Sequence, residues 1–403
     1  MQWLIINPTT FIWIKKRIGL IYDSDKFISF SFKLNSRISE ICNELLCPSN
    51  LNATVIKLED LNNENTYNWI SELVFKYKLG KLINGNKKKP ITLSPILKLQ
   101  NDVSFYKYEH SIGNGGSILN NIHELYFYIN PSTSGSHIYF KQLPYPHKKC
   151  PTLNMNQILQ FVKSCINPFL SEVCLVGNLF TYPHYKRFVN QMLGLVKNIK
   201  LNMTYADLIS HKTQLLELSV QYNISVSVLF DCSQENFWEF REFTFPMEFI
   251  FLTFSEFQYE QLSQTLNEIS EYHEVKIVPV FDGENLNFFE EYVFTSEEDI
   301  ATLEVTRREI FIHQSLNSND FGKIFILPNG NVHTNVNTEP VGNIDDSPYS
   351  IVYKEMTEGN SWLRIRNQQP CTNCIYQWLC PSPSNYELVI GKPNLCHINS
   401  DTF

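Results

Sequence analysis

Four of the ten cysteines lie close together near the end of this 403-residue chain: Cys371, Cys374, Cys380 and Cys396. The first two form a C-x2-C pair, which puts two thiolates on one turn where they can share a metal. Two further thiolates complete a four-sulfur set, which suits either Zn²⁺ or an iron-sulfur cluster. The sequence therefore predicts a metal centre, and the residue types alone leave the choice between one [4Fe-4S] cluster and zinc open.

The composition limits what else the protein can bind. A formal net charge of -8 lacks the basic footprint of a general nucleic-acid or membrane-surface binder. No uncharged stretch approaches the roughly 18 residues of a membrane span, and residues 1–8 lack the charged start and apolar core of a signal peptide. We therefore expect a cytoplasmic protein, in which clustered cysteines are metal ligands rather than disulfides.

The chain before the metal centre divides into two segments, and the first of them begins with strands. β-Branched and aromatic runs predict a small antiparallel meander over residues 11–15, 19–22 and 27–34. A helix follows, capped by Asn35 or Ser36, and the apolar spacing of residues 66–80 predicts a second helix. Residues 84–89 are rich in Asn, Gly and Lys and form the first predicted linker.

The second segment, from about residue 91 to residue 317, alternates apolar extended runs with runs of helical period. The predicted strands cover residues 124–129, 136–142, 172–176, 224–230, 249–254 and 275–280. The predicted helices include residues 185–196, 214–221 and 259–272. Strands that alternate with helices of this length indicate right-handed βαβ units, and so a parallel sheet or partial barrel.

The cysteine-rich end begins with a hairpin pattern. Residues 323–333 predict a strand, a turn at Asn329-Gly330 and a second strand. Together, the C-x2-C-x5-C run, the later Cys396, the hairpin Leu327-Pro-Asn-Gly-Asn-Val-His and the following Gly342-Asn-Ile resemble the SPASM domain appended to peptide-modifying radical SAM enzymes. More closely, Cys371-Thr-Asn-Cys-Ile-Tyr-Gln-Trp-Leu-Cys-Pro-Ser-Pro-Ser-Asn-Tyr is similar to the maturases and pseudo-maturases of Bacteroidales peptide systems whose precursors carry a Gly-Gly leader.

The resemblance implies fewer clusters than the family can hold. A complete SPASM domain carries two auxiliary [4Fe-4S] clusters, and the family pattern has another cysteine where Ser384 stands here. The hairpin positions Thr334 and Asn335 also lack thiols. What remains matches the ligand set of the second auxiliary cluster, so the resemblance implies one cluster, on the four cysteines named above.

The middle segment departs further from the family. A radical SAM enzyme needs a C-x3-C-x2-C run after the first barrel strand, to leave one iron open for the cofactor, and this spacing occurs nowhere in the chain. The corresponding loop, residues 144–154, offers Cys150 alone, and Gly177-Asn178 is a reduced form of the glycine-rich turn that touches the cofactor in active members. S-adenosylmethionine is therefore not expected to bind, and we predict no catalytic residue.

The first segment is similar in pattern to the leader-peptide recognition domain of peptide-maturation systems. An exposed edge strand can accept an extended peptide through main-chain hydrogen bonds, while a helix beside it offers apolar pockets. The residues predicted to bind a leader are Phe27, Ser29 and Ser31 on the strand and Trp69, Leu73 and Tyr77 on the helix. The alternative is that the three helix residues form the core of a winged-helix-like domain.

These observations predict an α/β protein of three parts: a winged-helix-like leader-recognition domain (1–88), a degenerate partial (β/α) radical-SAM-like barrel (89–320) and a cysteine-rich SPASM-like iron-sulfur domain (321–403). The resemblance implies a non-catalytic partner in peptide maturation, which binds the precursor's leader or an active radical SAM maturase and neither nucleic acid nor membrane. Two alternatives stay open: an active SPASM-type peptide-modifying enzyme whose cluster relays electrons, and a zinc-stabilised binding module.

Overall fold

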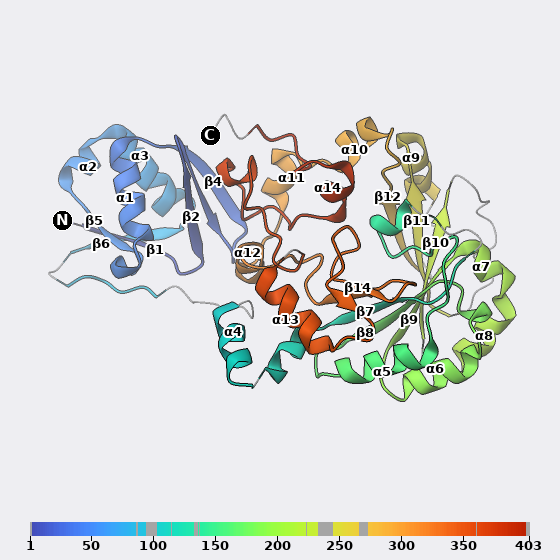
Figure 1. The fold of residues 1–403 in the computed structure, drawn as a ribbon. Coiled ribbons are helices and arrows are strands. Elements are labelled where there is room, and N and C mark those ends of the chain that lie inside the picture. The colour runs from blue at the N-terminus through green and yellow to red at the C-terminus, as the bar shows by residue number, and fades with distance from the viewer. Residues whose placement is uncertain are drawn as a thin grey trace.

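The computed structural model describes residues 2–85, 88–93, 103–113, 115–132, 136, 138–222, 224–232, 245–265, 273–359 and 361–399. Within these ranges the chain forms two three-stranded sheets and one nine-stranded sheet (Figure 1). No helix within them is long and apolar enough to cross a membrane.

The predicted N-terminal meander is confirmed. It consists of β2 (Thr10–Lys15), β3 (Ile18–Asp23) and β4 (Ile28–Lys33), which pair antiparallel in that order. Successive side chains point to opposite faces of a strand, and both faces of β2 are apolar. Ile12 packs with the helices of the N-terminal segment, whereas Trp13 packs with C-terminal residues. The meander is therefore covered on both sides.

A second small sheet has no counterpart among the predicted elements. Its central strand β1 (Gln2–Ile6) pairs antiparallel with β5 (Ala53–Ile56) and β6 (Gly80–Asn84). A Cβ atom at Gly80 would lie 2.5 Å from the carbonyl oxygen of Ile5, so the close approach of these strands requires glycine at that position.

Short helices cover one face of the meander. The first, α1 (Ser36–Leu46), begins as predicted at Asn35, whose side chain accepts a hydrogen bond from the Ile38 N–H at 2.8 Å. The second predicted helix ends earlier than residue 80. The helical elements from residue 48 to residue 76 are η1 (Pro48–Asn50), α2 (Leu58–Asn62), α3 (Glu64–Ser71) and the π-helical turn η2 (Glu72–Lys76).

The large sheet confirms the predicted parallel α/β arrangement. Six of its parallel strands are β7 (Glu124–Tyr128), β8 (Glu172–Val176), β9 (Ile199–Thr204), β10 (Ser225–Asp231), β11 (Glu248–Thr253) and β12 (Glu274–Pro279). All but β9 were predicted. The prediction of a strand at residues 136–142 was wrong, because η4 (Tyr139–Lys141) is a 3₁₀ turn there, and residue 137 lies outside the described ranges.

Helices cover the outer face of this sheet, where the largest apolar core lies. They are α5 (Met155–Cys165), α6 (Tyr185–Leu193), α7 (Tyr205–Ser210), α8 (Lys212–Gln221) and α9 (Glu256–Thr265), with η5 (Leu179–Thr181) before α6. Residues 266–272 of the predicted helix at 259–272 lie outside the described ranges. Leu125 and Phe127 of β7 face this core, whereas Tyr126 and Tyr128 face the opposite side.

The C-terminal segment extends the sheet. The predicted hairpin is confirmed as β13 (Lys323–Ile326), parallel to β7, and β14 (Asn331–His333), with Gly330 at φ 84° in the turn between them. Beyond β14 lies β15 (Gly342–Asn343), so the sheet runs from β12 to β15 and is open in the described residues.

Further helices connect these parts. Before β7 lie α4 (Val103–Ser111) and η3 (Gly116–Asn121), and after β12 come α10 (Leu286–Tyr292), α11 (Glu297–Thr302) and α12 (Arg307–His313). The last elements are α13 (Pro348–Glu358), η8 (Cys371–Asn373) and α14 (Asn385–Ile390). In Figure 1, α1 and α3 lie on one side of the meander, and α12 and the C-terminal loops lie on the other.

Candidate metal centre

The C-x2-C pair forms one tight turn, as the sequence predicts. Cys371 opens η8, and the N–H of Cys374 donates a hydrogen bond to the Cys371 carbonyl at 3.0 Å. Both thiols are buried, with 7% and 9% of the residue surface exposed. The turn therefore presents two sulfurs to the protein interior rather than to solvent.

The other two cysteines reach the turn from different directions. The N–H of Cys380 donates to the Tyr376 carbonyl at 3.0 Å, in a second turn that follows the first. Cys396 forms a parallel bridge with Thr295, just before α11. Backbone hydrogen bonds from Thr295 N–H to Leu395 and from His397 N–H to Thr295 hold that bridge.

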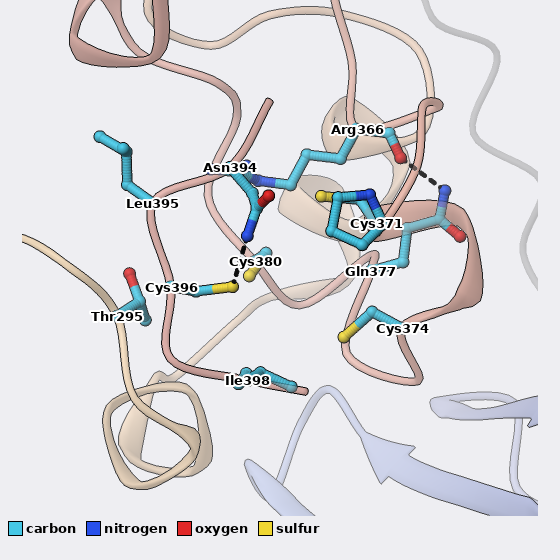
Figure 2. A pocket seen from close by; sticks show the side chains of 11 residues that line it. Thr295, Arg366, Cys371, Cys374, Gln377, Cys380, Asn394, Leu395, Cys396 and Ile398 are labelled. Carbon is cyan, nitrogen blue, oxygen red and sulfur yellow. Dashed lines mark hydrogen bonds between the residues drawn. The ribbon is translucent and has the colours of Figure 1, made fainter. Parts of the chain in front are cut away.

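All four predicted ligands line one pocket. Figure 2 shows the four sulfur atoms around a shared space, with Arg366, Gln377 and Asn394 beside them. The Asn394 amide donates to the Cys396 sulfur at 3.1 Å. Within the described ranges, no three Cys, His, Asp or Glu side chains are grouped tightly enough to hold one metal ion as they stand.

Two cations lie close to the sulfurs. Arg366 is held by hydrogen bonds to the Pro381 carbonyl at 2.6 Å and to Glu387 at 3.1 Å, and its charge acts on Cys371 and Cys380. Lys15 comes from β2 of the N-terminal meander, and its charge acts on Cys374. Neither cation was predicted. Arg366 belongs to no motif, and Lys15 is more than 350 residues away in sequence from the turn that it contacts.

Burial dominates the thiol electrostatics. It raises the pKa of Cys380 to about 12 and that of Cys374 to about 11, and it raises the pKa of Cys371 although Arg366 opposes the change. Buried thiolates need a compensating positive charge, which a bound metal supplies. Four sulfur donors on one buried pocket, with two cations beside them, fit a four-thiolate metal centre.

Hydrogen bonds satisfy the side chains that stand where the family pattern has further cysteines. Asn335 donates to both oxygens of the buried Asp320, at 3.0 and 3.1 Å, and to Asn385 at 2.7 Å. Thr334 donates to the buried Glu355 at 2.8 Å. Ser384 caps α14 through the Tyr386 N–H and Glu387. A polar network occupies this region.

The residues predicted to bind a leader peptide are distributed over both sides of the meander. Ser29 is half-buried and Ser31 exposed on β4, which is an edge strand of its sheet. Phe27 packs against the C-terminal residues, and Tyr77 stacks on Phe30 at 4.9 Å. Trp69 and Leu73 belong to the core of the N-terminal segment, with 3% and 0% exposed. For these two residues, such burial is what the alternative prediction expects, in which they form part of the core of the N-terminal domain.

The loop and turn that the sequence resemblance sets against the cofactor-binding region of radical SAM enzymes are packed into this fold. Burial raises the pKa of Cys150 to about 11. Gly177 has φ 123°, and a Cβ atom there would lie 2.4 Å from the Asn130 carbonyl oxygen, so glycine is required for close packing. The Asn178 side chain caps η5 and donates to Asp207 at 2.8 Å.

Comparisons with known proteins give distant structural matches. No protein-family profile and no curated protein sequence matches the chain. The structure of Streptococcus suis SuiB bound to the precursor peptide SuiA aligns with a TM-score of 0.43 and 10% identity, over 99% of this chain and 100% of that one. SuiB alone gives 0.42 and 9%, over 98% and 99%. BtrN in complex with AdoMet and 2-DOIA gives 0.32 and 11%, over 59% and 88%. These values are too low to carry a functional argument.

Proposed function

We propose that this protein is a non-catalytic partner in the maturation of a ribosomally made peptide, which binds the precursor's leader, an active radical SAM maturase, or both. The observation that carries the proposal is the distribution of thiols. Four line one pocket in the C-terminal segment, whereas the loop after β7 contains Cys150 alone. Three thiolates in that loop would be needed to hold a cluster with an open iron.

The four-cysteine pocket supports a structural role for the metal. A [4Fe-4S] cluster held by four thiolates supplies a rigid anchor and leaves no open iron for a substrate. The surrounding segment has little regular structure between η8 and α14, so a bound metal would stabilise much of its fold. Zinc on the same four thiolates is the alternative occupant.

The N-terminal meander supports the peptide-binding part of the proposal. β4 lies at the edge of its sheet, where an extended peptide can pair with the main chain. Both serines on this strand have small side chains, and Ser29 is half-buried while Ser31 is exposed. Phe27 and Tyr77 flank the strand, and Trp69 and Leu73 support it from the core.

The enzymatic alternative is tested by cofactor cleavage. Protein purified without oxygen and chemically reduced is incubated with S-adenosylmethionine, and 5'-deoxyadenosine is measured by chromatography. We expect no more product than in a sample without protein. Formation of 5'-deoxyadenosine in the absence of any partner would establish an active enzyme and overturn the proposal.

The leader-binding role is tested by calorimetric titration of the full chain with a synthetic Gly-Gly leader from a precursor encoded beside this gene. Lysine on an edge strand opposes strand addition, so Ser31→Lys is expected to weaken binding several-fold. Ser49→Lys, at an exposed position in η1, is the matched control and is expected to bind like the wild type. Equal binding by both variants would exclude the β4 edge as the site.

A further inference from the structure

The meander and the metal-binding turn share one apolar cluster. Leu20 and Tyr22 of β3 are buried in it together with Cys374, Ile375 and other residues of the turn. The remaining members come from the meander, from residues 300–310 and from the chain end: Phe11, Trp13, Ile18, Phe27, Ile300, Leu303, Val305, Ile310, Tyr376, Trp378, Leu379, Cys380 and Ile398. Two predicted metal ligands are thus part of an interface with the N-terminal segment.

A polar contact crosses the same interface. The Lys15 ammonium donates a hydrogen bond to the Thr372 carbonyl at 2.7 Å and another to the Gln377 side-chain oxygen at 3.2 Å. Thr372 lies inside the C-x2-C pair, and Gln377 lines the cysteine pocket. Gln377 is itself buried and donates to the Arg366 carbonyl at 2.7 Å. Lys15 therefore joins β2 to the backbone that carries the sulfurs.

The turn depends on partners for its shape. Between η8 and α14 it contains no helix or strand, and a short irregular segment buries too little surface to fold alone. Two things can order it: a metal on its thiols and the meander packed against it. Four thiolates also concentrate negative charge, which the Arg366 and Lys15 cations offset.

We infer that Lys15 supports the metal centre from outside the set of metal ligands. Through this residue, metal binding and docking of the N-terminal meander stabilise one another. The inference rests on the metal site of the proposed function and adds a coupling between that site and the peptide-binding segment. Such a coupling acts equally in both directions. Loss of the metal therefore weakens the docking of the meander, and loss of the Lys15 contact weakens metal binding.

The first test measures metal release from the full chain, purified without oxygen, to an excess of a chelator. Lys15→Met keeps most of the length of the side chain and removes the charge. We expect it to lose metal about tenfold faster than the wild type, because the charge-assisted hydrogen bonds from Lys15 to Thr372 and Gln377 are both lost. Lys15→Arg retains the charge and is expected to release metal at close to the wild-type rate. Lys33→Met, at an exposed position of β4, is the matched control and is expected to match the wild type.

The second test uses the unaltered protein. Hydrogen exchange of β2 and β3 is compared with and without metal, and β1 and β5 serve as internal controls because they share no residue with the interface cluster. We expect faster exchange in β2 and β3, and unchanged exchange in β1 and β5, when metal is removed. Unchanged exchange in these strands, or equal metal release by Lys15→Met and the wild type, would refute the coupling while leaving the metal site intact. A chain that binds no metal would refute the site and the coupling together.

Discussion

The Tyr22 hydroxyl bonds to both backbone polar groups of one distant residue. It donates to the Val305 carbonyl and accepts from the Val305 N–H, each at 2.8 Å. Tyr22 is 2% exposed, and Val305 is 5% exposed, just before α12. One side chain of the N-terminal meander thus satisfies two buried main-chain groups of the C-terminal part, whose desolvation would otherwise be costly.

Replacement of Tyr22 by phenylalanine is expected to destabilise the protein by about 1–3 kcal/mol, because it leaves both Val305 groups buried without this partner. Urea unfolding measures the change. Tyr67→Phe is the matched control, because Tyr67 is 47% exposed on α3, and its stability is expected to change by less than about 0.5 kcal/mol. Equal stability of the two variants would show that the bonds to Val305 contribute nothing.

The buried network around Asp320 gives a second prediction. Asn335→Ala removes the amide that donates to both Asp320 oxygens, and leaves Arg364, at 3.3 Å, as the remaining charged partner. We expect a loss of about 2 kcal/mol in unfolding free energy, measured by chemical denaturation. Asn156→Ala, at an exposed position in the first turn of α5, should change it by less than about 0.5 kcal/mol. A wild-type result for Asn335→Ala would mean that the network does not hold this region together.

Glu248 of β11 gives a prediction about pH. Burial alone would raise its pKa, but hydrogen bonds from Lys200, Lys276 and Ser227 outweigh burial and lower it to about 2 from an ordinary value of 4.5. The ionised carboxylate therefore stabilises the fold fully above pH 4.5, and this contribution is lost as the pH falls from 4.5 towards 2.

Glu248→Gln is expected to be less stable than the wild type at pH 7, and the difference should shrink as the pH is lowered through that window. Unfolding followed by circular dichroism between pH 7 and pH 3 measures it. Glu274→Gln is the control, because Glu274 pairs with Lys276 at 3.0 Å while it is 64% exposed, and exposed pairs contribute about 0–1 kcal/mol. A difference that stays constant with pH would contradict the lowered pKa.

The sequence predicted the elements that are specified by residues next to one another in the chain. The cap at Asn35, the meander, β8 and the turn at Asn329-Gly330 each follow from neighbouring residues, and the structure confirms them. The sheet around β1 was missed because its partners are about 50 and 80 residues away in sequence. β9 was missed because polar Asn202 and Thr204 interrupt its apolar pattern, although both are buried in the structure.

The candidate metal centre also has a part that the sequence predicts and a part that only the fold brings together. The C-x2-C pair is a local signal, and the turn at Cys371 and Cys374 has the form that the spacing predicts. Lys15 carries no such signal, because only the fold brings β2 against the turn. Burial of Trp69 and Leu73 likewise depends on how α3 and η2 pack under the meander.

The most direct test of the account is the iron, sulfide and zinc content of the full chain purified without oxygen. We predict about four irons and four sulfides per chain, with visible charge-transfer absorption. Cys374→Ala should abolish both, whereas Cys47→Ala, at an exposed position outside the pocket, should retain them. One zinc without iron, or no metal at all, would contradict a single iron-sulfur cluster on Cys371, Cys374, Cys380 and Cys396.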